Sequence, residues 1–121
     1  MQILSRAELE QHRCEPCRDG AVPCSQAQAE KQLEQLAGWK LVDSGRRIRR
    51  DWKVKNFLAG LEFFRLVGEA AEDAEHHPDL HLENYRDVAI EIWTHSIGGL
   101  SVNDFSLAAK IDAIAGSLSL K

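Results

Sequence analysis

The sequence has few cysteines, no long apolar run and no excess of positive charge. Its three cysteines all lie within the first 24 of 121 residues, and an odd number grouped in this way does not form a disulfide framework. No stretch approaches the roughly 18 apolar residues of a membrane span, and the N-terminus lacks the basic start and apolar run of a signal peptide. These absences favour a cytoplasmic protein that does not interact with a membrane.

The charge balance also argues against one class of partner. Fifteen basic and 19 acidic residues give a formal net charge of −4, which provides no electrostatic reason to expect direct nucleic-acid binding. The one basic cluster, residues 46–50, coincides with an alternating strand pattern. We therefore interpret it as the solvated face of a strand.

Residues 1–24 are predicted to form a weakly structured lead. Ser5 and Glu8 could open a short helix through a capping box, but the polar run of residues 10–13 offers little to bury. The lead contains a group of potential metal ligands: His12, Cys14, Cys17 and Cys24. A small metal site, redox chemistry and an inert segment all remain open for this group, and the missing C-x-x-C partner of Cys24 favours the inert segment.

Residues 25–121 are predicted to form one α+β domain with the element order αββαββα. Helices begin at the capping residues Ser25, Asn56 and Ser101, and hairpins are expected at residues 39–54 and 80–94. This order predicts a four-stranded antiparallel sheet with three helices packed on one face. The middle helix, ending near residue 75, is expected to bury one stripe: Phe57, Leu61, Phe64, Gly68, Ala71 and Glu75. The opposite face of the sheet, with Trp93 on it, would need cover, which predicts a homodimer or homotetramer.

The stretch from Glu72 to Asp79 is the strongest candidate for chemistry. His76 and His77 follow two carboxylates at the end of an amphipathic helix, and Pro78 stops the helix there. Histidine is the side chain whose unperturbed titration lies nearest neutral pH, so this pair suits proton transfer. A helix C-terminus also stabilises a protonated imidazole.

Three further features of this region have more than one interpretation. His77 and His81 are four residues apart, as in some zinc sites, but Pro78 breaks the helical geometry that this spacing needs. His95 ends a strand before two glycines, where it could line a pocket or only bond the backbone. Asp104 could act as the acid of the Ser101 capping box alone.

The motifs together resemble the pterin-4a-carbinolamine dehydratase family. The resemblance covers about residues 25 to 118 and rests on Glu72-x-x-Glu75-His76-His77-Pro78-Asp79, Tyr85-x-x-Val88, Thr94-His95, Gly99-Leu100-Ser101 and Asp104. It implies the same four-stranded fold and the removal of water from a 4a-hydroxytetrahydropterin. The family uses neither a metal nor an organic cofactor, because the pterin is the substrate.

The resemblance also implies roles for individual residues. The catalytic histidines would be His76, His77 and His95, of which the first two form the acid–base pair in an order that the sequence leaves open. The supporting residues would be Glu72, Glu75, Pro78 and Asp104. A non-catalytic alternative exists on the same fold, since related proteins act as a dimerisation cofactor of a homeodomain transcription factor or assist Rubisco assembly.

Overall fold

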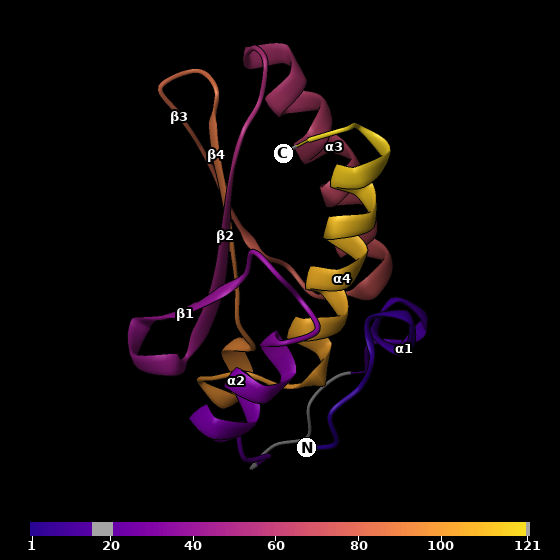
Figure 1. Ribbon diagram of the computed structural model, residues 1–121, viewed down its shortest axis with the longest axis vertical. Helices are drawn as coiled ribbons and strands as arrows, with labels where there is room; N and C mark the ends of the chain where they lie inside the picture. The colour runs from indigo at the N-terminus through magenta and orange to yellow at the C-terminus, as the bar shows by residue number, and fades with distance from the viewer. Residues whose placement is uncertain (16–20, 121) are drawn as a thin grey trace.

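A four-stranded antiparallel sheet is the frame of the protein, which a computed structural model describes over residues 1–15 and 21–120. Across the sheet the strands are β1 (Lys40–Val42), β2 (Arg47–Lys53), β4 (Asp87–Ile92) and β3 (Asp79–Glu83). Two long helices, α3 (Phe57–Ala74) and α4 (Val102–Ser117), cover one face (Figure 1). The predicted α+β class and antiparallel sheet are confirmed.

Tight turns with left-handed backbone close the two hairpins. A short 3-10 helix, η1 (Asp43–Gly45), joins β1 to β2, and its Ser44 has a φ of 57°. Asn84 and Tyr85 join β3 to β4 with φ values of 48° and 53°. Positive φ in a hairpin turn matches the right-handed twist of the strands. Both hairpins therefore form at the positions that the sequence predicts, and β2 and β4 pair at the centre of the sheet.

The sheet separates an apolar inner face from a charged outer face. On β4 the inward residues Val88, Ile90 and Ile92 are at most 1 % exposed and pack into the main core. On the outer face Arg49 of β2 contacts Glu91 of β4, with 2.7 Å between Nη1 and Oε2. Arg47 also contacts Glu91, so two arginines of the basic cluster have a partner on the neighbouring strand.

Helix α3 buries the predicted stripe only in part, since Ala71 is buried and Phe64 packs against the core as expected. Its buried residues are Gly60, Phe63, Val67 and Ala71, whereas the expected core residues Phe57 and Leu61 are 49 % and 43 % exposed. A Cβ atom at position 60 would lie 3.1 Å from Leu82 Cδ1, so the glycine lets the β3–β4 hairpin approach the helix closely. Two stripes of helical period exist in this segment, and contact with the hairpin selects the second.

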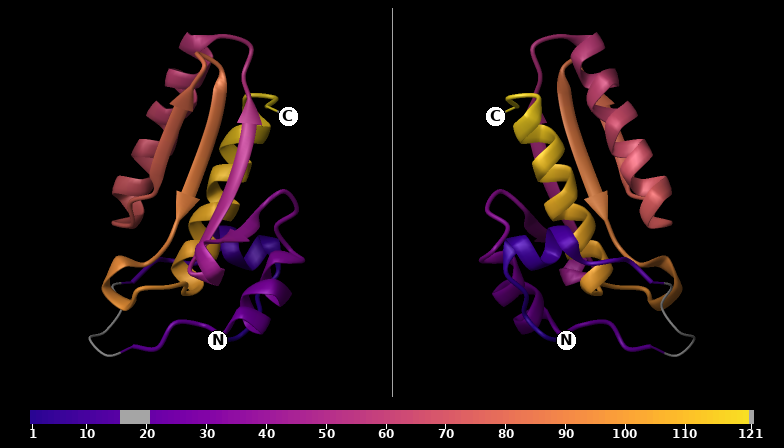
Figure 2. Two further views of the ribbon diagram at one scale, coloured as in Figure 1. Left: turned by 90° about the vertical axis from the view of Figure 1, so that its left-hand side faces the viewer. Right: turned by 90° about the vertical axis from the view of Figure 1, so that its right-hand side faces the viewer.

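The lead contributes a fourth α-helix, α1 (Arg6–Gln11), to the described residues. The Ser5–Glu8 capping box forms as predicted, and the helix that it opens packs into the domain through a residue before the polar run. Leu9 is fully buried in the main core, and α1 packs against α4 (Figure 2). Ser106 of α4 donates a 2.8 Å hydrogen bond to the Leu9 carbonyl.

The remaining helix, α2 (Gln26–Leu33), begins at the predicted Ser25 capping box. Its fully buried Gln32 also holds the lead, because the side-chain amide both accepts from the Leu4 N–H and donates to the Leu4 carbonyl, at 2.9 and 2.8 Å. Within the described ranges, no helix combines the length and apolar character needed to cross a bilayer.

Candidate active site

The end of α3 directs the histidine pair. The helix ends at Ala74, and Glu75 adopts the left-handed conformation with φ 52° and ψ 40°. The N–H groups of Glu75 and His76 return to the carbonyls of Glu72 and Ala71, at 3.2 and 3.1 Å. This is the Schellman pattern, in which glycine is the usual left-handed residue. A glutamate at that position costs roughly 1 kcal/mol, and it places a carboxylate beside both histidines.

His76 turns inward and pairs with Asp104. His76 Nε2 lies 2.6 Å from Asp104 Oδ1, and the two side chains are 12 % and 0 % exposed. The other carboxylate oxygen accepts from the Thr94 hydroxyl at 2.7 Å and from the Ser101 N–H at 2.8 Å. A carboxylate only accepts, so a neutral imidazole in this contact donates through Nε2 and keeps Nδ1 as an acceptor. Asp104 is therefore both the capping acid that the sequence predicts and the orienting partner of His76.

His77 turns outward and pairs with Glu72, which lies one turn earlier on α3. Both side chains are largely exposed, at 63 % and 77 %. An exposed contact of this kind contributes little to stability. Its effect is to hold one ring nitrogen of His77 and leave the other available to a ligand.

His95 approaches from the strand side. It is the first residue of a short 3-10 helix, η2 (His95–Ile97), and lies three residues after Ile92, where β4 ends. Its ring stacks on Trp93 with 4.3 Å between centroids, and the Arg47 guanidinium lies 4.6 Å from the Trp93 ring centre. Gly98, with a φ of 65°, turns the chain back so that Thr94 and Gly99 pair.

All three predicted catalytic histidines line one hollow. Its volume is about 230 Å³, and its lining residues are Glu75, His76, His77, Trp93 and His95. An adjoining hollow of about 280 Å³ shares Glu75 and His76 and also includes Thr94, Ser96, Asn103 and Glu15. Glu72 and Asp104 hold histidines from outside these hollows, and Pro78 leads directly into β3. Sequence reasoning did not identify Trp93 or Glu15 as site residues.

The sequence offers two metal alternatives, one at His77 and His81 and one in the lead. Over residues 1–15 and 21–120, no group of three or more His, Cys, Asp or Glu side chains is arranged to hold a metal ion. His77 pairs with Glu72, whereas His81 lies on β3 with Nε2 3.9 Å from Glu91 Oε2. The cysteine cluster of the lead is not tested, because Cys17 lies outside the described residues.

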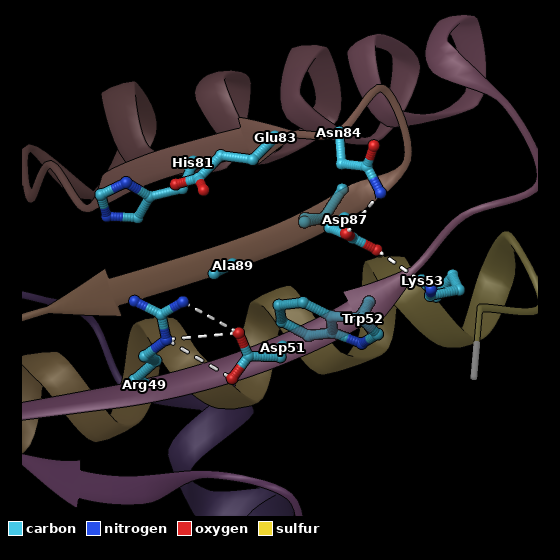
Figure 3. A pocket seen from close by; sticks show the side chains of 10 residues that line it. Arg49, Asp51, Trp52, Lys53, His81, Glu83, Asn84, Asp87 and Ala89 are labelled. Atoms are coloured by element: carbon cyan, nitrogen blue, oxygen red, sulfur yellow. Dashed lines mark hydrogen bonds and ion pairs between the residues drawn. The ribbon is translucent and has the colours of Figure 1, made fainter.

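A larger hollow lies on the outer face of the sheet, around β2, β3 and β4 (Figure 3). Its volume is about 560 Å³. Most of its charged groups already have partners, since Arg49 pairs with Asp51 and Lys53 with Asp87 (Figure 3). The smaller hollows bring together three imidazoles, one of which is held by the buried Asp104 carboxylate. We therefore place the candidate active site there.

The fold and the site define a small α+β protein equipped for acid–base chemistry at paired imidazoles. Residues 22–114 match the family model described as pterin 4 alpha carbinolamine dehydratase. The chain belongs to this family.

Individual relatives agree with this assignment. The chain is 45 % identical over 115 residues to pterin-4-alpha-carbinolamine dehydratase 2, mitochondrial, of Arabidopsis thaliana, covering 93 % of this chain and 62 % of the relative. A relative from Halorhodospira halophila, named for the same dehydratase, is 45 % identical over 84 % of this chain and 92 % of its own length. The solved structure of a transcriptional coactivator/pterin dehydratase from Brucella melitensis is 32 % identical with a TM-score of 0.72, over 78 % of this chain and 99 % of that one. The chain thus spans less than two thirds of the plant relative and nearly all of the bacterial ones.

Proposed function

We propose that this protein catalyses the dehydration of a 4a-hydroxytetrahydropterin to the quinonoid dihydropterin. The observation that carries this proposal is that three imidazoles line one hollow in a chain of the pterin-4a-carbinolamine dehydratase family. The reaction removes the proton on N5 and the hydroxyl on C4a, releases water and forms the C4a=N5 double bond. It therefore needs one base and one acid at neighbouring positions.

The contacts of the histidines support a division of this work. His76 and His77 form the acid–base pair, each with one ring nitrogen held by a carboxylate and the other available. His95, on the opposite side of the hollow, contacts the hydroxyl side of the substrate. Glu72, Glu75 and Asp104 orient the imidazoles or the substrate, and Pro78 fixes the backbone that follows the pair. Proton transfer alone accounts for the reaction, so the proposal includes neither a metal nor an organic cofactor.

Histidine substitutions test the proposal. The substrate is generated in place by an aromatic amino-acid hydroxylase, and formation of the quinonoid product is followed by absorbance. We expect His76→Ala, His77→Ala and His95→Ala each to lower kcat by about 10²- to 10⁴-fold, the usual contribution of a general acid or base.

The matched control is His81→Ala. His81 has the same side chain and lies four residues from His77, but it lines the outer hollow and not the imidazole one. It is expected to retain wild-type turnover. Wild-type turnover in all three active-site variants would show that the mechanism is wrong, and an inactive wild-type protein would favour a protein-binding role.

We further propose that the chain self-associates as a homodimer or homotetramer. On α3 three apolar residues near the helix start, Phe57, Leu58 and Leu61, are 43–74 % exposed, and clusters of this kind often mark interaction sites. The outer sheet face, for which the sequence predicts cover, instead has cross-strand ion pairs. Sedimentation of the wild type and of Leu58→Glu tests this, with a smaller species expected for the variant. The cytoplasmic location and the absence of nucleic-acid and membrane partners stay predictions from the sequence.

A further inference from the structure

The lead is fastened directly beside the active site by a buried amide. Asn103, the residue before Asp104, is 6 % exposed. Its Nδ2 donates to the Glu15 carbonyl at 2.5 Å, and its Oδ1 accepts from the Glu15 N–H at 3.4 Å. A buried amide that loses such partners costs about 1–3 kcal/mol. The backbone of Glu15 is therefore held next to Asp104 by the side chain of Asn103.

The other described end of the lead docks on the loop that follows His95. Cys24 donates its N–H to the Leu100 carbonyl at 2.9 Å. Pro23 lies so close to Gly99 that a Cβ atom there would be 2.6 Å from Pro23 Cβ. Gly99 thus has to lack a side chain for this contact. The lead therefore contacts the segment between His95 and Asp104 at two places, through Glu15 at Asn103 and through Pro23 and Cys24 at Gly99 and Leu100.

This attachment makes Glu15 a lining residue of the hollow of about 280 Å³. That hollow also includes Glu75 and His76, which it shares with the three-imidazole hollow. Among the described residues that line it, none is lysine or arginine. Two carboxylates at one hollow favour a ligand that presents N–H or O–H donors.

We propose that Glu15 is a specificity-determining residue that binds the donor-rich edge of the pteridine ring, namely the 2-amino group and N3–H. The inference rests on the proposed function and names how that site recognises its substrate. When C4a and N5 lie among the imidazoles, the pyrimidine half of the ring extends into the adjoining hollow. Two parallel N–H groups match the two oxygens of a carboxylate. Glu15 lies outside residues 22–114, which the family model matches.

Two related rings separate this role from general binding. Pterin carries the 2-amino group, whereas lumazine has an oxygen at that position. We expect the wild-type protein to bind pterin more tightly than lumazine, measured by ligand fluorescence, and Glu15→Gln to reduce that preference by about tenfold, the contribution of a hydrogen bond to a charged group. In the dehydration assay the same variant should raise KM by a similar factor and leave kcat unchanged, because ground-state binding is lost.

The control is Glu10→Gln, the same change on α1, away from both hollows. The Glu10→Gln protein should retain the wild-type preference for pterin. The Glu15→Gln protein should fold normally, because the Glu15 side chain is exposed. An unchanged pterin-to-lumazine ratio in Glu15→Gln, in a protein whose wild type dehydrates the carbinolamine, would overturn the inference alone. A wild-type protein that neither binds pterin nor dehydrates the carbinolamine would overturn the proposed function and this inference together.

Discussion

Replacing Asp104 by asparagine tests whether the buried carboxylate sets the protonation pattern of His76. The two carboxylate oxygens accept three hydrogen bonds, from His76, Thr94 and Ser101. An asparagine has one oxygen and one NH₂ group, so it cannot accept on both sides. If its oxygen faces Ser101, its NH₂ group faces His76 and forces the imidazole proton from Nε2 to Nδ1. If its oxygen faces His76, its NH₂ group faces the Ser101 N–H, and two hydrogen-bond donors then meet at the start of α4.

The two orientations of the asparagine differ in how much free energy of unfolding they cost. The second orientation loses a helix cap, worth about 0.5–2 kcal/mol, and buries an unsatisfied donor at about 1–3 kcal/mol. The first orientation avoids most of this loss but converts the free ring nitrogen of His76 from an acceptor to a donor. We expect Asp104→Asn to lower the free energy of unfolding by about 1–3 kcal/mol and kcat by at least about 10²-fold.

The assay combines turnover with direct observation of the ring. Dehydration is measured with substrate generated by a hydroxylase, and ¹⁵N NMR of His76 reports which nitrogen carries the proton. Asp73→Asn is the control, because Asp73 lies on the same helix as Glu72 and is exposed. A folded Asp104→Asn protein with turnover within about twofold of wild type would refute the reasoning, because a wrongly protonated general acid or base should cost far more.

Two further predictions follow from shifted pKa values. Burial raises the pKa of Asp112 above 3.8 despite its contacts with Trp39, Arg50 and Arg6, so the stability that it contributes is full below pH 3.8 and is lost as pH rises through the folded-state pKa. Urea unfolding should show wild type gaining stability relative to Asp112→Asn on acidification, and Asp112→Ala, which strands the Trp39 N–H, should be less stable than Asp112→Asn by about 1–3 kcal/mol; equal pH profiles would contradict this. Burial, together with the nearby Asp104 charge, also raises the pKa of the Cys24 thiol. At pH 8 iodoacetamide should therefore alkylate Cys24 more slowly than it alkylates the thiol of free glutathione, and equal rates would be inconsistent with that pKa.

Local patterns in the sequence were sufficient for the elements and for half of the site. Capping boxes at Ser25 and Ser101 and turn residues in both hairpins are short-range signals, and each forms where predicted. The histidines at positions 76 and 77 could be identified because they are adjacent and precede proline. Such features depend on residues within one helical turn of each other.

Features that depend on distant contacts could not be predicted in the same way. The pairing of His76 with Asp104 joins residues 28 apart, and the bond between Ser106 and Leu9 joins residues 97 apart. The burial of Leu9 and the position of Glu15 depend on such contacts with α4. The α3 stripe was mispredicted in part, because the approach of Leu82 to Gly60 is a tertiary contact that the helical period does not contain.

The position of the His76–Asp104 pair between two helix ends explains why this fold suits the proposed reaction. His76 follows the C-terminus of α3, and Asp104 lies in the first turn of α4, so the two helix ends bring the pair together. Asp104 accepts from His76 with one oxygen and from the Ser101 N–H with the other, which fixes the imidazole to the start of α4. Because α1 and the lead pack on the first half of α4, they also help to hold this helix end in place, so loosening the lead should disturb turnover as well as stability.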